Sequence, residues 1–352
     1  ACNETTEAVT CKAEWPSATA PLFAQRPGVA GSWGIGLDSS TTTEKLVVFA
    51  HGPAAKATSG VQRTDQDRYI NRVFASDLTQ DGGFNGGKYF THDVSGLNLG
   101  DNSRRGTVLA DGSILSSGYT NLGSPGPGNH IAVIKLTSLG VFDESFGFSQ
   151  NETTYPTVLG QTLSNPFIAV GGVAEAYGVT VLSNGKMVTT GYGSSNFNVT
   201  SVAPDLVVTS FDSEQLDATF GGKVGGSMSG AFAVQSETDT APGVGLSTSA
   251  YEDRGRHVAA LSDDRTVHAG AYDGRAAIHV LTTAGRPDST VDGTGRLVFA
   301  YEGNLFGLGV SEDHLRIVAT STTRAKVVGT TVQNSRFAKT MVALVQVEDL
   351  DE

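Results

Sequence analysis

The chain has 352 residues, of which 44 are glycine, and charged residues make up 17%. The glycines do not recur every third residue, which excludes collagen. The composition also lacks the excess of Ala, Glu, Lys and Leu that is typical of long helices. The formal charge of −12 argues against a nucleic-acid partner, because binding phosphates requires clustered Lys and Arg. No apolar run approaches the ~18 residues of a membrane-spanning helix. The composition therefore predicts a glycine-rich, all-β protein without a transmembrane segment.

Residues 1–31 form an N-terminal segment that contains both cysteines, Cys2 and Cys11. A disulfide between them would close a small loop and suits an exported protein. The alternative is that Cys2 is the lipidated first residue of a bacterial lipoprotein. Because the chain begins at Ala1 rather than Met, a removed signal peptide fits both cases. We therefore expect an exported protein, located in the periplasm, at the cell surface or outside the cell.

One pattern recurs five times over residues 32–352, in copies that begin near residues 32, 104, 176, 253 and 305. Each copy starts with a short strand that carries glycine, and a turn then leads to a second strand that ends in glycine. The turns Asp111-Gly112 and Asn184-Gly185 are the signal of a two-residue hairpin, which needs positive φ at both positions. In the fifth copy either residues 316–320 or 325–329 fit the second strand. We prefer 325–329, because this stretch ends in glycine.

A third, strongly apolar strand follows in each copy, at residues 69–75, 131–136, 206–211, 277–281 and 341–347. An Asp-Phe-Gly turn and a fourth strand come next, and the fourth strand is clearest at 88–91 and 296–300. Four short antiparallel strands repeated several times are typical of the blades of a β-propeller. We therefore predict a single all-β propeller of five blades with four antiparallel strands each. Six blades are the alternative, if the long loops contain a degenerate copy.

The run at residues 216–223 (LDATFGGK) follows an apolar strand and an Asn-Gly hairpin, and it resembles the delta-60 repeat of bacterial proteins. Copies two and three match this repeat well, the first copy partly and the fourth loosely. The resemblance covers about residues 32–349, and it implies a propeller-like, usually exported protein. It implies no particular activity and no catalytic residues.

The fifth copy ends after its third strand, which would leave an unpaired sheet edge. Residues 20–25 are similar in sequence to residues 295–300, the fourth strand of the preceding copy. We therefore expect residues 20–25 to pair with the last blade as its outermost strand and to close the ring. Pro21 is tolerated there, because an edge strand has one side without ladder hydrogen bonds.

The innermost strands of a propeller converge on its axis, so the residues just before the five strand glycines form the candidate ligand site. They are three aromatic residues and two arginines: Trp33, Arg105, Tyr177, Arg254 and Phe306. Such a ring could stack a sugar or hold an anion, because a guanidinium group offers a planar fork of donors. The alternative is that the aromatic rings pack between blades and the arginines pair with acids. Strand alternation predicts that the residues one position earlier, Arg104 among them, face the other way.

Signals of catalysis or metal binding are weak: the chain has no HExxH, CxxC or GxSxG motif, and its histidines are dispersed. Asp-rich turns at 77–81 and 263–264 leave calcium open as a cofactor, since calcium prefers oxygen ligands. We therefore predict an exported, non-catalytic binding or scaffold module that engages a protein or carbohydrate partner through the channel mouth or the loops. The alternative is a glycosidase-like hydrolase with paired carboxylates at the channel mouth.

Overall fold

A computed structural model of the chain describes residues 2–3, 10–11, 31–53, 65–123, 128–150, 155–168, 171–194, 205–224, 228–234, 253–302, 304–310, 316–324 and 338–346. The regular elements in these ranges are β-strands, and the described residues contain no α-helix. They therefore include no helix that could span a membrane. The prediction of an all-β chain is confirmed.

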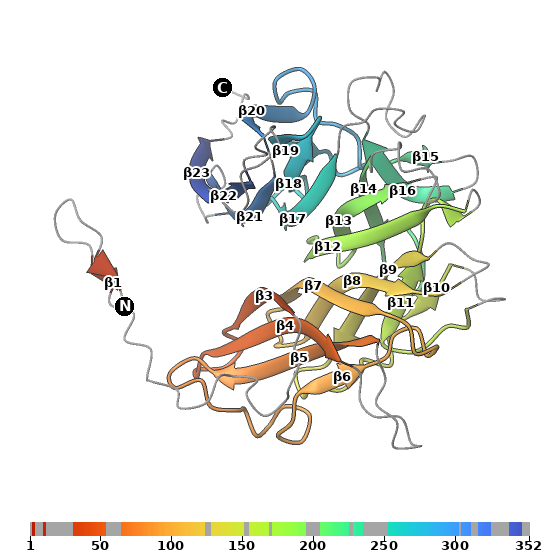
Figure 1. The fold of residues 1–352 in the computed structure, drawn as a ribbon, viewed down its shortest axis with the longest axis vertical. Coiled ribbons are helices and arrows are strands. Elements are labelled where there is room, and N and C mark those ends of the chain that lie inside the picture. Colours follow the sequence, from red (N-terminus) through yellow and green to blue (C-terminus); the bar gives the residue numbers. More distant parts are fainter. Residues whose placement is uncertain are drawn as a thin grey trace, which may run out of the picture.

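Five sheets follow one another along the chain, and each begins with the strand nearest the common centre (Figure 1). The first sheet contains β3 (Gly31–Asp38), β4 (Lys45–Pro53), β5 (Gln66–Phe74) and β6 (Phe90–His92). The second contains β7 (Asp101–Val108), β8 (Ile114–Asn121), β9 (Asn129–Leu136), β11 (Gln161–Ser164) and β10 (Phe148–Ser149). The third contains β12 (Val173–Val181), β13 (Met187–Ser194), β14 (Asp205–Phe211), β16 (Met228–Val234) and β15 (Gly222–Val224).

The fourth sheet contains β17 (Arg254–Ala260), β18 (Thr266–Tyr272), β19 (Arg275–Leu281) and β20 (Arg296–Glu302). The fifth contains β21 (Leu305–Val310), β22 (Arg316–Arg324) and β23 (Ala338–Gln346). All strand pairs in these sheets are antiparallel except β10 with β11. In the fifth sheet the second strand is thus 316–324, and the preference for 325–329 is wrong. The register explains this result, because Ile317 and Val318 pair with β21 on one side and β23 on the other.

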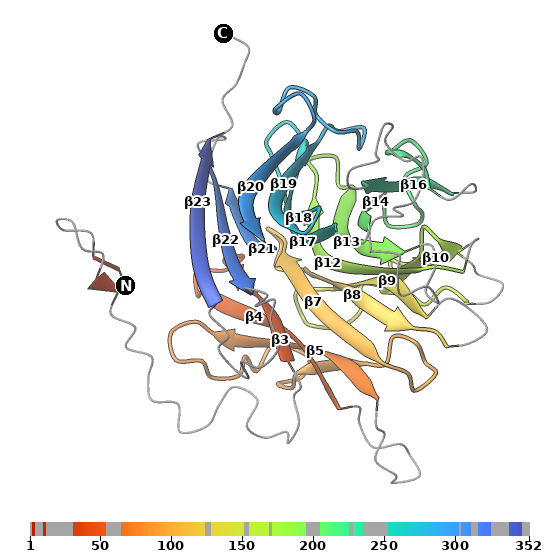
Figure 2. The same cartoon turned by 45° about the horizontal axis from the view of Figure 1, so that its top comes forward.

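The inner strands contact one another in chain order, β3 with β7, β7 with β12, β12 with β17 and β17 with β21. Figure 2 shows the five sheets fanned around this common centre, with β23 on the outer edge. Among the described residues, β21 and β3 share no comparable contact, so the series of inner strands does not form a closed ring. The structure therefore shows five sheets in a radial arrangement.

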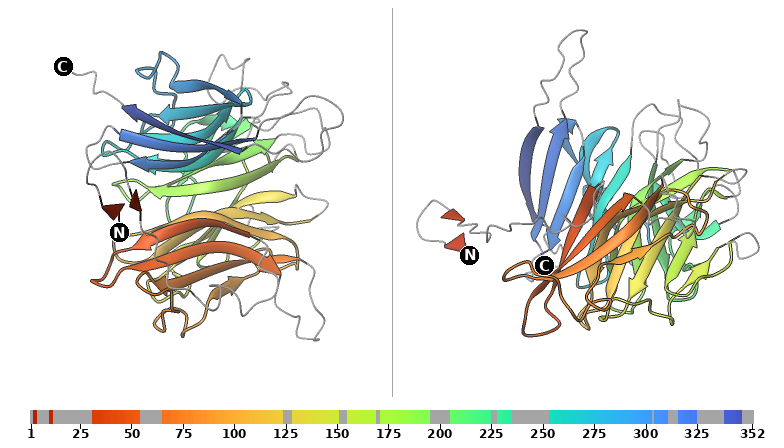
Figure 3. Two further views of the ribbon diagram at one scale, coloured as in Figure 1. Left: turned by 60° about the vertical axis from the view of Figure 1, so that its left-hand side comes forward. Right: turned by 60° about the horizontal axis from the view of Figure 1, so that its bottom comes forward.

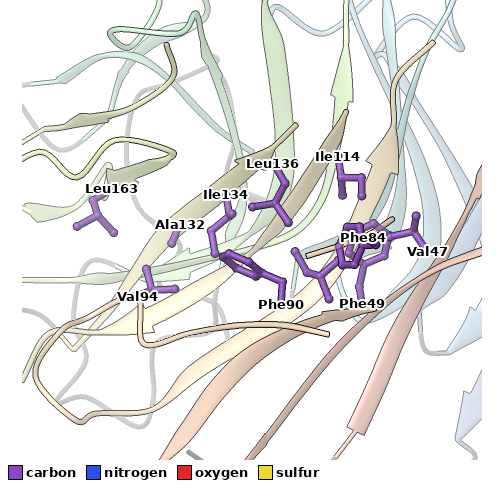
Figure 4. Close-up of a cluster of buried hydrophobic side chains, with 11 residues drawn as sticks. Val47, Phe49, Phe84, Phe90, Val94, Ile114, Ala132, Ile134, Leu136 and Leu163 are labelled. Atoms are coloured by element: carbon purple, nitrogen blue, oxygen red, sulfur yellow. The ribbon is translucent and has the colours of Figure 1, made fainter. Parts of the chain in front are cut away.

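The hydrophobic core lies between neighbouring sheets, because each sheet turns alternate residues toward each of its two neighbours. Between the first two sheets, Val47 and Phe49 of β4 meet Ile114 of β8 and Ile134 of β9 (Figure 4). Similar clusters join the second sheet to the third and the third to the fourth. Leu305 of β21 belongs to a cluster of the fourth sheet.

The hairpin turns differ from the predicted two-residue type. Gly112 and Gly185 have φ of +79° and +82°, and they are the residues with positive φ in their dipeptides. Leu109 N donates to Ser113 O, so the loop is one residue longer than predicted. This geometry is the three-residue hairpin, a type I turn followed by a left-handed glycine.

The N-terminal segment is described only at β1 (Cys2–Asn3) and β2 (Thr10–Cys11), which pair antiparallel with Cys2 opposite Cys11. The backbone register thus places the two cysteines in directly opposed positions, while the disulfide itself stays a prediction. Residues 20–25 lie outside the described residues. Figure 3 shows β23 as the outermost strand of the fifth sheet, which has three strands where the first and fourth have four.

Candidate functional site

Each of the five inner strands carries a β-bulge at an equivalent position near the centre of the molecule. The pairing register shifts just after Ser32, Ser103, Ala176, Gly255 and Leu305. A bulge leaves its extra residue outside the ladder and re-aims that side chain. The residues that follow these five positions are Trp33, Arg104, Tyr177, Arg256 and Phe306. Going from sheet to sheet, the bulge positions thus alternate between aromatic residues and arginines.

The side chains at these bulges stack on one another, and we call Trp33, Arg104, Tyr177, Arg256 and Phe306 the central belt. The Arg104 guanidinium carbon lies 4.4 Å from the Trp33 ring centre and 4.6 Å from that of Tyr177. The Arg256 guanidinium lies 4.5 Å from Tyr177 and 5.4 Å from Phe306. Each arginine therefore contacts the aromatic rings of both neighbouring sheets, and each such cation–π contact contributes about 0.5–2 kcal/mol, depending on its desolvation.

The predicted site residues agree with the central belt at three of five positions, Trp33, Tyr177 and Phe306. The prediction that Arg105 and Arg254 occupy positions equivalent to these three aromatic residues is wrong. The bulge of β7 contains two residues, and Arg105 is the second of them. In β17 the bulge follows Gly255, whereas Arg254 precedes this glycine. The prediction that Arg104 faces away fails for the same reason, since a bulge interrupts strand alternation.

The glycines of the second strands are the signal that would have given the correct alignment. A Cβ at Gly118 would lie 1.9 Å from the carbonyl oxygen of Asn102, and one at Gly191 would lie 1.8 Å from that of Glu175. The inner strand approaches this closely just before its bulge. The glycine on the second strand therefore marks the bulge position.

Arg105 and Arg254 lie next to the central belt. Arg105 Nη2 donates a hydrogen bond to the carbonyl oxygen of Phe306, which connects the second sheet to the fifth. The Arg254 guanidinium lies 4.3 Å from the Tyr192 ring centre. All five predicted residues are therefore near the centre of the molecule, but Arg105 and Arg254 hold positions different from those expected.

Polar groups surround the belt where the inner strands begin. Glu175 is ion-paired with Arg104 at 3.7 Å, and its Oε1 accepts a hydrogen bond of 2.6 Å from Asn129. Burial raises the pKa of Tyr192, and the nearby Glu175 carboxylate raises it further. Burial, followed by the same carboxylate, raises the pKa of Tyr119 to about 12. Both phenols therefore remain neutral hydrogen-bonding groups at physiological pH.

The belt carries positive charge in a chain whose net charge is −12. Within the described part of the chain, Arg105 and Arg256 form no ion pair, and burial lowers the pKa of both guanidinium groups. Arginine stays protonated even so. A partly buried charge without a counter-ion is costly. A bound anion would offset this cost.

Two further carboxyl groups are buried near the same end of the inner strands. Burial raises the pKa of Asp101 to about 8 and that of Asp253 to about 8. Asp101 accepts hydrogen bonds from Val94 N at 2.7 Å and from the Thr120 hydroxyl. Asp253 accepts one from Asp273 N at 2.6 Å. Both carboxyl groups thus hold strand connections in place, and Glu175 is the described carboxylate that pairs with the belt.

The two ends of the sheets differ in their connections. We call the end where the inner strands begin the loop end, because connections such as 195–204 and 235–253 start and finish there. The opposite end is the turn end, where the first strand turns into the second and the third into the fourth. It carries short hairpins such as 109–113 and 182–186.

The Asp-rich turns suggested for calcium are held by donors of the protein. Asp77 accepts hydrogen bonds from the backbone and hydroxyl of Thr79, and Asp263 is ion-paired with Arg265 at 2.6 Å. A different group of carboxylates lies close together, formed by Asp65, Asp67 and Asp93. One carboxylate oxygen of each of these residues lies within 4.8 Å of those of the other two. Oxygen donors of this kind suit Ca²⁺. The sequence did not indicate this group, because Asp93 is distant in sequence from Asp65 and Asp67 and comes close to them through the pairing of β5 with β6.

Comparisons with known proteins find only distant similarity. No family model matches the chain, and no curated protein matches it. Among solved structures, a B. megaterium levansucrase mutant is 10% identical with a TM-score of 0.38, over 94% of this chain and 88% of that one. A Leishmania mexicana mannose phosphorylase is 12% identical with a TM-score of 0.28, over 78% of this chain and 71% of that one. A Pyrococcus horikoshii acylaminoacyl peptidase is 9% identical with a TM-score of 0.25, over 92% and 52%. Similarities this weak support no statement about activity.

Proposed function

We propose that the five sheets are the blades of a closed β-propeller, with residues 20–25 as the outer strand of the fifth blade. The order of the inner-strand contacts supports this proposal, as does the recurrence of one bulge in all five sheets. Among the described residues β23 has no partner on its outer edge, which supports the added strand, because an exposed edge favours pairing with another strand. The resemblance to the delta-60 repeat agrees with this architecture.

We propose that this propeller is exported and acts as a non-catalytic binding module for a carbohydrate that carries anionic groups. The observation that carries the proposal is the central belt, in which Arg256 has no carboxylate partner among the described residues while Trp33 keeps 41% of its surface exposed. An exposed indole ring offers an apolar face to a sugar ring, and a guanidinium group binds carboxylate or sulfate with two parallel hydrogen bonds.

The alternative hydrolase is less well supported by the described residues. Glycoside hydrolysis needs two carboxyl groups about 5–10 Å apart around the scissile bond. Glu175 is the described carboxylate that pairs with the belt, and its nearest charged partner is Arg104. Asp101 and Asp253 are engaged by backbone donors of neighbouring loops. The belt side chains also stack on one another, as expected for a binding module rather than for an open catalytic channel.

The proposed function is tested by binding to an array of oligosaccharides that includes uronate-bearing, sulfated and neutral members. We expect preferential binding of the anionic members and no release of reducing sugar from any of them. Trp33→Ala should weaken binding about tenfold or more, since stacking on an aromatic ring contributes ~1–3 kcal/mol.

The matched control for this experiment is Leu139→Ala. Leu139 is 64% exposed and lies in a turn at the turn end, so its truncation should leave saccharide binding unchanged. Preferential binding of neutral saccharides would contradict the anionic ligand. Binding of none, or equal losses in Trp33→Ala and Leu139→Ala, would contradict the proposed site.

A further inference from the structure

One face of β3 carries an apolar row that the described structure leaves uncovered. Ile35 is 64% exposed and Leu37 is 53% exposed, although both belong to an innermost strand. The opposite face of β3 carries Gly34 and Gly36 and packs against β7. Neighbouring large apolar residues exposed on one strand face mark an interaction surface rather than ordinary surface.

The same row is at least partly buried in each of the other four sheets. Counted from the bulge, the position of Leu37 is taken by Val108, Val181 and Ala260 in the next three sheets. Each of these residues packs against a cluster of the preceding sheet. In the fifth sheet Leu308, at the position of Ile35, packs on the fourth sheet in the same way. This row of the other four inner strands therefore covers the sheet before it, whereas the described residues leave the row of β3 exposed.

The contact between β3 and β7 shows what kind of strand surface packs against this row of side chains. A Cβ on Gly34 would lie 3.1 Å from Arg105 Cα, and one on Gly36 would lie 3.0 Å from Val108 Cγ2. Glycines at these two positions thus allow the next inner strand to approach closely. β21 has the same Gly-x-Gly pattern, Gly307 and Gly309, at the same distances from its bulge. The inner strands of the second, third and fourth sheets lack the second glycine of this pattern.

We propose that the fifth sheet of the same chain docks on the exposed row of β3, with Leu37 seated over Gly309 as Val108 is seated over Gly36. This inference rests on the proposed closed ring and names the interface that closes it. The fifth sheet is within reach, because Arg105, the neighbour of Gly34, already donates a hydrogen bond to Phe306 O of β21.

The inference is tested by disulfide trapping in a chain that carries Cys2→Ser and Cys11→Ser. Leu37→Cys combined with Gly309→Cys should form an intramolecular disulfide under mild oxidation, detected as a linked peptide in the monomer by mass spectrometry. The positive control is Gly36→Cys with Val108→Cys, which joins two strands already in contact. The negative control is Gly36→Cys with Gly309→Cys, because Gly36 faces the second sheet. We expect trapping about tenfold faster than in the negative control, since a preformed contact raises the effective thiol concentration.

A trapping rate equal to that of the negative control would overturn the inference, and a disulfide between two chains would assign the row to a second copy instead. A second variant keeps the test decisive if the cysteine pair does not fold. Leu37→Asp should lower the thermal midpoint, whereas Leu139→Asp, at a position 64% exposed, should not. Equal midpoints in these two variants would also overturn the inference. Saccharide binding measured in parallel separates a failure of this interface from a failure of the proposed function.

Discussion

The turn end and the central belt differ in how far equivalent positions of the repeat hold the same kind of residue. At the turn end, four sheets use one device, an aspartate that accepts a hydrogen bond from the backbone two residues later and pairs with a cation: Asp81, Asp143, Asp217 and Asp288. In the belt, five equivalent positions hold Trp, Arg, Tyr, Arg and Phe. Residues that recur in every repeat serve the fold, and residues that differ between repeats make one asymmetric surface.

The aspartate device also connects neighbouring sheets. Asn85 N donates to Leu139 O at 2.8 Å, Gly147 N to Ser213 O at 2.9 Å, and Gly221 N to Ala284 O at 2.7 Å. Each of these hydrogen bonds runs from one Asp-Phe-Gly turn to the short hairpin that precedes the corresponding turn of the next sheet. The turn end is thus a chain of identical junctions, and a defect there should act on stability alone.

The largest loss of stability is expected from Arg72→Met at the turn end. Arg72 is buried and pairs with Asp38 at 3.1 Å and Asp81 at 2.8 Å. Removing the cation leaves buried carboxylates with less compensation, which costs about 3–5 kcal/mol. Urea unfolding measures this loss, and saccharide binding below the unfolding transition should be unchanged. The control is Lys186→Met, whose ion pair with Asp217 is more exposed and should cost only about 0–1 kcal/mol.

A pH effect is expected where the belt meets the fifth sheet. Leu308 N donates to His257 Nδ1 at 2.7 Å, which requires a neutral ring nitrogen. Burial, followed by the nearby Arg105, lowers the pKa of His257 from 6.5 to about 4. The stability that depends on neutral His257 is complete above pH 6.5 and is lost as the pH falls toward 4, by about 3 kcal/mol.

This pH effect is measured by urea unfolding between pH 7 and pH 4, in the wild type and in His257→Asn. The Asn amide oxygen can accept the same Leu308 hydrogen bond but does not titrate, so the variant should show a smaller loss. Other buried histidines, such as His268 and His279, also have lowered pKa values and titrate in both proteins. An equal pH dependence in the two proteins would show that His257 does not couple the fourth and fifth sheets.

Arg104→Met should destabilise the belt by about 2–3 kcal/mol, because it removes three cation–π contacts and the partner of buried Glu175. In contrast to Arg72→Met, this variant should also change the tryptophan emission and weaken saccharide binding. Arg275→Met is the control, since Arg275 is half exposed and pairs with Asp273 only at 3.6 Å. If Arg104→Met left both readouts at the control values, the contrast between the two ends would fail.

The smallest effect on stability is expected when the cation that pairs with the turn aspartate is transferred from the third strand to the second. Lys45, Lys186 and Arg265 stand before or at the start of the second strand. The second sheet has Ser113 there, and Lys135 of the third strand pairs with Asp143 at 2.9 Å instead. Lys135→Ser should cost about 1 kcal/mol. Adding Ser113→Lys should restore part of this loss in urea unfolding, and a further loss would show that the four devices are not interchangeable.

The sequence predicts the repeated end of this molecule better than the belt, and the reason is physical. An Asp-x-Ser/Thr-Phe turn encodes its own geometry, because the side chain hydrogen-bonds to the backbone two residues later. The belt depends on bulges, and one extra residue reverses which side chains share a face. Trp33, Tyr177 and Phe306 were found because a strand glycine follows each of them directly. Arg104 and Arg256 were missed because Arg105 and His257 follow them directly, where the other three copies have glycine.

The measurement that tests the division between a repeated fold and an asymmetric binding surface most directly is tryptophan fluorescence in Trp15→Phe. This variant keeps Trp33 as the one tryptophan, since the chain has 2. Titration with the anionic oligosaccharide that binds most tightly in the array should shift the Trp33 emission to the blue, with the dissociation constant found by calorimetry. Binding by calorimetry with unchanged Trp33 emission would place the ligand away from the central belt and contradict the account.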